Sequence, residues 1–218
     1  MTKQTKSKER VSDFGEVFTS EREVNAMLDL VKDETLRIES RFLEPACGDG
    51  NFLIEVLRRK LDVVKRRYGK NPDEYERYSV LAVTSIYGVE LLEDNTLACR
   101  LRLFDFWNDN YSKQLKDKAS NQTRSSIKFI LKRNILNGDA LTLKEKNGQP
   151  IIFSEWSAVN GSYLKRRDYR LDELLEGHEE QLSIFSTDWE YDEEIKAMIP
   201  KPIKEFPPIH YNEVSKYE

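Results

Sequence analysis

The sequence predicts an α/β fold, in which a mostly parallel sheet carries helices on both faces and is followed by an irregular C-terminal extension. Two observations predict it. Short apolar runs alternate with long amphipathic segments, as strands joined by crossover helices do. In addition, the stretch FLEPACGDGNFL joins an apolar run to a periodic one through two glycines, as a tight turn from a strand into a helix requires.

The composition indicates a globular protein of one domain. The 218 residues fit one domain of ordinary size, and a hydrophobic fraction of 39% with a charged fraction of 34% is typical of a globular chain. The net charge of -4 argues against a protein that coats nucleic acid generally, because that affinity comes from clustered Lys and Arg. With no long apolar segment and no secretory signal, we expect a cytoplasmic protein without a membrane partner.

The first elements follow from capping and periodicity. Ser20 with Glu23 three residues later is a capping-box pattern, and it predicts the start of a helix. Residues 41–43 predict a short strand before the glycine turn. The two helices on either side of this strand are predicted by apolar residues at helical spacing: Val24, Met27, Leu28 and Val31 in the first, and Phe52, Leu53, Val56, Leu57, Leu61 and Val64 in the second.

The later elements are predicted in the same way. Residues 80–89 predict a second strand and residues 91–107 a second helix, whereas 109–126 are polar and predict a loop. An apolar pattern over 127–136 then leads to Asn-Gly-Asp-Ala, and residues 150–153 predict another strand.

Three regions are expected along the chain. Residues 1–12 form a basic arm, and residues 13–160 form the α/β domain. Beyond Trp156 the pattern weakens into a basic stretch, an acidic helix over 172–182 and a proline-rich end. Residues 161–218 are therefore expected to be an extension that packs on the domain or binds a partner.

Acidic residues follow three of the predicted strands, where ligands sit in folds of this kind. The turn over 44–50 contains Glu44 and Asp49 and no lysine, so a pyrophosphate would be repelled and the ligand should be cationic or neutral. Glu90 is placed to accept from the two hydroxyls of a ribose, and Asp139 to accept from the exocyclic amine of an adenine. S-adenosylmethionine, an adenosine with a cationic amino-acid tail, meets all three requirements.

The stretch FLEPACGDGNFL resembles the S-adenosylmethionine loop of the amino-group DNA methyltransferases of bacterial restriction and modification systems. A second motif of that family, G-E-x-[FY]-T-P, appears as Gly-Glu-Val-Phe-Thr-Ser, with Ser20 in place of the proline. The resemblance spans residues 14–141 and implies a class I methyltransferase-like, Rossmann-like sheet. Carried over residue by residue, it implies these cofactor contacts: Phe18, Thr19, Glu44, Pro45, Ala46, Gly48, Asp49, Gly50, Phe52, Glu90, Leu91, Asp139 and Ala140.

The resemblance also implies a function, methyl transfer from S-adenosylmethionine to the adenine amino group in DNA, with a restriction or specificity subunit as a partner. The family's catalytic motif [DNS]-P-P-[YFW] is not found in its expected place. Ser154, Glu155 and Trp156 stand there instead, as candidates to accept from the amine and to stack on the flipped base. Three readings stay open: an enzyme with an altered site, a subunit that needs another polypeptide, and an inactive cofactor-binding or scaffold module.

The basic stretch around Lys165, Arg166 and Arg167 is flanked by tyrosines, and this combination suits a phosphate backbone and unstacked bases. The alternative is a charged loop whose aromatic residues turn toward the core. Cys47 and Cys99 have neither a paired spacing nor a neighbouring histidine, so neither a disulfide nor a metal site is predicted.

Overall fold

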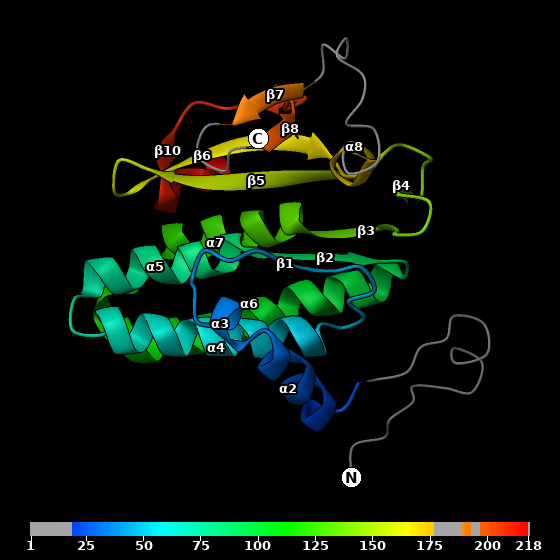
Figure 1. The fold of residues 1–218 in the computed structure, drawn as a ribbon. Coiled ribbons are helices and arrows are strands. Elements are labelled where there is room, and N and C mark those ends of the chain that lie inside the picture. Colours follow the sequence, from blue (N-terminus) through cyan, green and yellow to red (C-terminus); the bar gives the residue numbers. More distant parts are fainter. Residues whose placement is uncertain (1–18, 177–188, 193–196, 218) are drawn as a thin grey trace.

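The computed structural model describes residues 19–176, 189–192 and 197–217, which form a mixed α/β structure (Figure 1). No helix in this part of the chain is both long and apolar enough to cross a membrane. The helices are α2 Glu21–Leu30, α3 Lys32–Thr35, α4 Asn51–Tyr68, α5 Pro72–Thr84, α6 Glu93–Leu115, α7 Asn121–Asn134 and α8 Leu171–Glu176, with 3-10 turns η1 Lys116–Lys118 and η2 Tyr211–Lys216. The strands are β1 Phe42–Glu44, β2 Ile86–Glu90, β3 Ile135–Asp139, β4 Lys144–Glu145, β5 Ile152–Val159, β6 Tyr163–Arg170, β7 Trp189–Asp192, β8 Ala197–Pro200, β9 Lys204–Glu205 and β10 Ile209–His210.

The first sheet has the order β1-β2-β3-β4 and is mostly parallel. β1, β2 and β3 run parallel to one another, with Leu43 opposite Tyr87 and Val89 opposite Leu136, and only β4 is antiparallel. Each parallel crossover contains two helices, α4 with α5 and α6 with α7. The three parallel strands therefore end at the same edge of the sheet.

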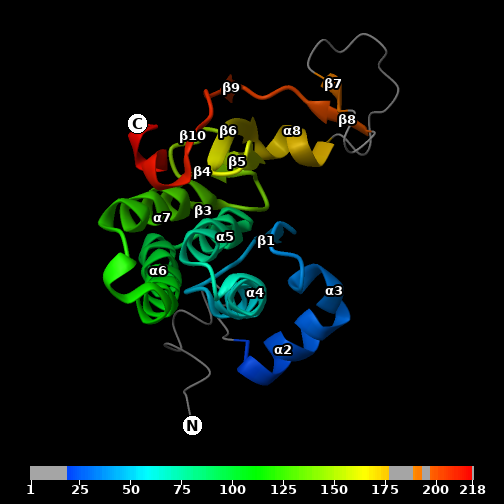
Figure 2. The ribbon, with the colours of Figure 1, turned by 90° about the vertical axis from the view of Figure 1, so that its left-hand side faces the viewer.

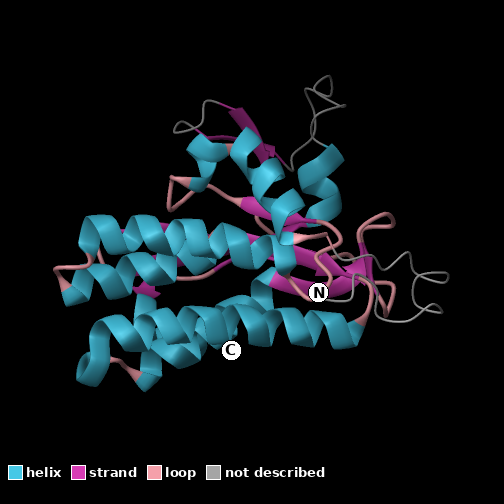
Figure 3. Cartoon of the chain, turned by 90° about the horizontal axis from the view of Figure 1, so that it is seen from below, coloured by secondary structure: helices cyan, strands magenta, loops and turns pink. Residues whose placement is uncertain are grey.

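Helices cover one face of this sheet. α4 packs on β1 and β2, and α6 packs on β2 and β3, so that Leu53, Ile86, Cys99 and Ile135 join one buried cluster. Figure 3 views the molecule from this side, with the helices in front of the strands. Figure 2 looks along α4, α5 and α6, which lie side by side.

The opposite face is covered mainly by a second sheet, and this corrects the expectation of helices on both faces. β5 and β6 form a long antiparallel hairpin, with β9 and β10 both paired to β6. Tyr87, Val89 and Leu136 point toward this hairpin and pack against Ile151 and Phe153. The ring of Tyr87 meets that of Phe153 edge-on at 5.4 Å, and its hydroxyl donates to the Ser154 carbonyl over 3.1 Å.

The first two predicted helices are present, although in the first one Met27 is exposed and Val31 follows the last helical residue. Ser20 caps α2, since its hydroxyl accepts from the backbone of Glu23 while the Glu23 carboxylate accepts from the Ser20 N–H. Val24 and Leu28 are the buried positions of α2, which packs on the outer side of α4 (Figure 1). α4 begins immediately after the glycine turn, as predicted.

Two later predictions are wrong. Residues 80–84 belong to helix α5 and only 86–90 form a strand, because Asn71 caps α5 and Pro72 suits its first turn. The predicted loop over 109–126 is mostly helical, with α6 running to Leu115 and α7 starting at Asn121. The buried side chains Trp107, Tyr111 and Leu115 are spaced four residues apart, as on one face of a helix. This spacing could have predicted the second half of α6, although polar residues separate the three positions.

The C-terminal part is built into the fold. The predicted boundary at residue 160 lies in the turn of the β5–β6 hairpin, so the segments on its two sides pair along their whole length. After β10 the chain returns to α7 as η2, where Tyr211 and Val214 are buried. The predicted acidic helix is confirmed as α8 only to Glu176, and the rest of 172–182 lies outside the described residues.

Lys60 is a fully buried cation that joins α4 to two other segments. The three N–H groups of its ammonium are shared among four oxygens, the carbonyls of Arg37 at 3.2 Å and Ile38 at 2.8 Å, the Ser40 carbonyl, and the hydroxyl of Ser85 at 2.8 Å. Burial lowers the pKa of Lys60 to about 7, against the opposing effect of the negative charges of Glu39 and Glu34. Lys60 thereby holds the chain just before β1 against the start of β2.

Candidate functional site

Three carboxylates lie at the carboxyl ends of adjacent parallel strands. Glu44 ends β1, Glu90 ends β2 and Asp139 ends β3, with Gly88 opposite Glu44 and Asn137 opposite Glu90 in the sheet register. The sequence predicted these residues for a ligand site, and the topology brings them to one edge. We call this edge, together with the turn over 44–50, the acidic strand edge.

The glycine turn connects β1 to α4 within six residues. The Cys47 N–H donates to the Val89 carbonyl over 3.0 Å, which extends the pairing of β1 with β2 beyond the strand. The chain then reverses at Gly48 and Gly50, whose φ angles of +53° and +94° favour glycine. A Cβ on Gly48 would meet no atom within 4 Å, so the backbone there borders open space. A ligand can therefore approach the Gly48 backbone closely.

Glu90 is buried and organises the turn. One carboxylate oxygen accepts from the Gly48 N–H over 2.8 Å, and the other accepts from the Leu92 N–H over 2.9 Å. Asn95 donates to the second oxygen over 3.4 Å. Each carboxylate oxygen has two lone pairs, so the oxygen that accepts from Gly48 keeps one lone pair with which Glu90 can accept from a hydroxyl of a ligand. The link to Gly48 ties β2 to the turn, and sequence reasoning did not foresee it.

Asp49 already has a cationic partner. Arg102 of α6 approaches its carboxylate at 2.6 Å and also donates to the Asp49 carbonyl over 2.8 Å and to the Asn51 side chain over 2.9 Å. Sequence reasoning missed Arg102, because it lies 53 positions along the chain, in the middle of a helix. The pairing offsets one negative charge of the turn.

Glu44 and Asp139 have opposite electrostatic environments. Burial raises the pKa of Glu44, against the opposing effect of the Ala46 N–H. The Leu141 N–H, which donates to Asp139 over 2.8 Å, lowers the pKa of Asp139 and keeps that side chain ionised. Asn137 bridges the strand ends between them, donating to the carbonyls of Glu90 over 2.9 Å and Leu91 over 3.0 Å.

The other predicted cofactor contacts lie around this edge. Leu91 follows Glu90 and is 54% exposed, Ala140 follows Asp139, and Pro45 and Ala46 lie in the exposed part of the turn. Phe52 is in the first turn of α4. Thr19 is an exposed residue before α2, and no described contact joins it to the turn, while Phe18 lies outside the described residues.

The predicted catalytic residues lie on β5, in the second sheet, and are engaged with other side chains. Ser154 is fully buried and donates to Asp168 over 2.7 Å. Trp156 is 5% exposed, and its indole N–H donates to the Asn134 side chain over 2.9 Å. Glu155 forms an ion pair with Arg41. None of the three presents a free acceptor or ring face at the acidic strand edge.

The predicted DNA contacts do not form one continuous basic patch. Lys165 and Arg167 point to one side of β6 and both pair with Glu205, at 2.7 Å and 3.9 Å. Arg166 points to the other side, is 4% exposed and pairs with Asp168 over 2.7 Å. The carboxylate partners reduce the charge that this stretch offers to a phosphate backbone.

Comparison with known proteins adds no family assignment: no family model, curated protein or solved structure matches this chain. Among the described residues, no group of His, Cys, Asp and Glu is arranged to hold a metal ion. The site is therefore interpreted from its own geometry.

Proposed function

We propose that this chain binds S-adenosylmethionine at the acidic strand edge, as the cofactor-binding unit of an adenine-specific DNA methyltransferase of a restriction and modification system. The observation that carries the proposal is the meeting of Glu44, Glu90 and Asp139 at one sheet edge, beside a glycine turn that borders open space. The finer fold class belongs to the proposal too: β1, β2 and β3, joined by helical crossovers, are compatible with a class I methyltransferase-like, Rossmann-like sheet.

The carboxylates of the acidic strand edge match the chemical groups of S-adenosylmethionine. Glu44 suits the cationic amino-acid tail, and the remaining lone pair of Glu90 suits a ribose hydroxyl, because carboxylates at such strand ends accept from a ribose. Asp139, held ionised by the Leu141 N–H, suits the adenine amine. The exposed side chain of Leu91 offers an apolar surface for the adenine ring.

Methyl transfer from a bound cofactor requires alignment more than a strong base. The amino nitrogen of the target adenine attacks the methyl carbon, the carbon–sulfur bond breaks, the amine loses a proton to solvent, and S-adenosylhomocysteine is left. The burial of Ser154 and Trp156 favours a version in which residues of another polypeptide align the target adenine. A second candidate, cofactor binding without transfer, is favoured by the same burial.

The decisive experiment is a calorimetric titration of the purified chain with S-adenosylmethionine, S-adenosylhomocysteine, ATP and NAD. Saturable binding of the first two compounds alone supports the proposal, and no binding of either contradicts it. A second assay measures transfer of a labelled methyl group to duplex DNA by the chain alone. Cofactor binding without methyl transfer would support either a subunit that needs another polypeptide or an inactive cofactor-binding module. Methyl transfer by the chain alone would contradict both of these hypotheses.

A further inference from the structure

A basic groove lies on the other side of the molecule, between α7 and the second sheet. It has a volume of about 480 Å³, and its lining includes Lys132 and Arg133 of α7, Arg166 of β6, Lys204 of β9 and the rings of Phe129 and Phe206. Asp168 and Tyr217 complete the lining. Arg133 precedes β3, so the groove lies toward the amino end of that strand rather than at the acidic strand edge.

The groove is strongly cationic in a chain whose net charge is -4. Four cationic side chains line it against the single carboxylate of Asp168. Asp168 is committed mainly to Arg166 over 2.7 Å and contacts Arg133 at the longer distance of 3.3 Å. Within the described ranges, Lys132 and Lys204 have no carboxylate within ion-pair distance, and both are exposed. Burial, and then the neighbouring charge of Arg166, lower the pKa of Arg133, as expected where cations are concentrated.

Aromatic rings make part of the groove apolar. The Arg166 guanidinium lies over the Phe206 ring at 4.1 Å, and the Lys204 ammonium lies 4.7 Å from the same ring centre. Phe206 in turn contacts Tyr217, with ring centres 5.3 Å apart. The Tyr217 hydroxyl donates to the Leu164 carbonyl over 3.1 Å, so the aromatic side of the groove is anchored to β6. A ligand thus meets preformed cationic and ring surfaces together.

We propose that this groove binds a nucleotide unit, with its phosphate at Lys132, Arg133 and Lys204 and its base against Phe129 and Phe206. Positive charge beside aromatic rings is the combination that holds phosphate and a flat base in single-stranded nucleic acid sites. The volume is within the range of sites for ligands of nucleotide size. The nucleotide unit can be a free nucleotide or part of a single strand, since both offer the same groups. The inference does not depend on cofactor binding at the acidic strand edge.

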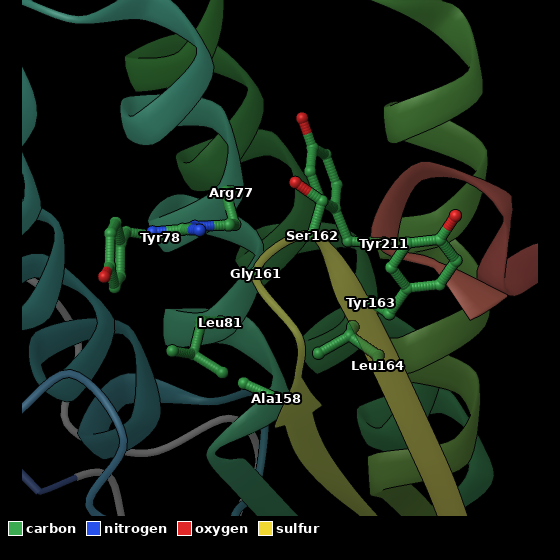
Figure 4. Close-up of a pocket in the computed structure, with 9 residues that line it drawn as sticks. All are labelled: Arg77, Tyr78, Leu81, Ala158, Gly161, Ser162, Tyr163, Leu164 and Tyr211. Carbon is green, nitrogen blue, oxygen red and sulfur yellow. The ribbon is translucent and has the colours of Figure 1, made fainter. Parts of the chain in front are cut away.

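A second cavity is a weaker candidate for the same chemistry. It has a volume of about 210 Å³ and lies between α5 and the turn of the β5–β6 hairpin (Figure 4). Arg77, the one cation in its lining, lies over the Tyr78 ring at 4.5 Å, and Tyr163 and Tyr211 line the other side. One cation gives little preference for a phosphate, so the proposal concerns the basic groove alone.

The test is fluorescence anisotropy with a labelled oligothymidylate of about ten nucleotides, which covers one site of this kind. The double variant Lys132→Gln/Lys204→Gln should bind at least ten times more weakly than the wild-type chain. The slope of log affinity against log salt should also become shallower by up to about 0.7, because the two lysines hold one phosphate and each phosphate contact on a single strand contributes ~0.7. The matched control is Lys70→Gln/Lys113→Gln, which removes the same charge from exposed positions outside the groove.

Competition identifies the source of the nucleotide unit. Stronger competition by unlabelled oligonucleotide than by AMP assigns the groove to single strands, and equal competition per nucleotide assigns it to free nucleotides. Equal binding by the groove variant and the wild-type chain would overturn the proposal, as would an equal loss in the control variant. Competition by inorganic phosphate as strong as by AMP would also overturn it, because the base would then contribute nothing. Calorimetry with S-adenosylmethionine on the same variants separates this result from the proposed cofactor binding.

Discussion

The acidic strand edge and the basic groove differ most in how their charges are already satisfied. At the edge, backbone N–H groups hold Glu90 and Asp139, and Arg102 holds Asp49. In the groove, Lys132 and Lys204 extend from exposed positions without a carboxylate partner among the described residues. Charges fixed in advance favour one ligand geometry, whereas exposed lysines without a carboxylate partner attract many anions and are screened by salt. The edge should therefore select by shape, whereas the groove should attract a phosphate by charge and distinguish the base through its rings.

The largest expected effect is a loss of folding stability from a substitution at the acidic strand edge, which lies outside the basic groove. In Gly50→Ala, the new Cβ would lie 2.8 Å from the buried sulfur of Cys99, at a φ of +94° that disfavours any side chain. We expect a loss of about 2 to 4 kcal/mol in the free energy of unfolding, measured by denaturant titration.

Gly48→Ala is the matched control for that substitution. Its φ of +53° is also strained, yet its Cβ would meet open space, so about 1 kcal/mol should be lost. If a ligand approaches the Gly48 backbone, this variant should lose cofactor affinity while it stays folded. Equal stability losses in the two variants would contradict the close contact with Cys99.

The next effect is a difference in cofactor affinity between substitutions of two carboxylates at the acidic strand edge. Glu90→Ala should weaken cofactor binding by about 1 to 3 kcal/mol, because Glu90 both accepts from the ligand and holds the Gly48 backbone. Asp49→Ala should cost less, since Arg102 already neutralises that carboxylate. Calorimetry of both variants tests the ranking, with the double groove variant as the control of unchanged affinity. A larger loss for Asp49→Ala would show that its pairing with Arg102 is given up on binding.

Trp156 is expected to contribute to folding stability rather than to cofactor binding. Its indole N–H donates to Asn134, whose amide donates to the carbonyls of Thr84 and Ile86. Trp156→Phe keeps an aromatic ring but leaves the Asn134 oxygen without this donor, so about 1 to 2 kcal/mol of folding stability should be lost. Cofactor affinity should not change. A variant of unchanged stability that loses methyl transfer to DNA would instead support the stacking role.

The smallest expected effect is a pH dependence at the edge. Because burial raises the pKa of Glu44, its contribution to stability is present below the ordinary pKa and lost as pH rises through the raised value. Affinity for a cationic ligand runs in the opposite direction, since it needs the ionised carboxylate. It should therefore fall as the pH drops through the raised pKa of Glu44, by an amount that solvent screening keeps small. Glu44→Gln should remove this part of the profile in calorimetric titrations, and Asp139→Asn should not.

Local signals predicted the acidic strand edge well. The capping box at Ser20, the glycine turn and the apolar face of α4 depend on neighbours within one or two turns of helix. The carboxylates at strand ends follow from the rule that parallel strands end together. Arg102 and the bond from Gly48 to Glu90 could not be predicted, because both join residues more than 40 positions apart.

The basic groove could not be predicted for a related reason. Its cations come from α7, β6 and β9, segments that only the hairpin and the returning C-terminal chain bring together. The cluster that the sequence did display, Lys165 to Arg167, is divided by strand alternation between two faces of β6. The strand predicted over 150–153 overlaps only the start of β5. The rest of the second sheet was missed because β5 and β6 carry charged residues at buried positions, such as Arg166 and Asp168, where an alternating strand pattern would have apolar ones.

Lys60 has a consequence for the order in which the chain folds. Its ammonium leaves water completely, which costs several kcal/mol unless its acceptors are already assembled. Those acceptors come from residues 37–40 and from Ser85, on opposite sides of α4 in the sequence. α4 can therefore form early, but its amine should lose water only when the segment before β1 and the start of β2 dock together. This docking is then a late and cooperative step, and substitutions at Lys60 should speed unfolding more than they slow folding.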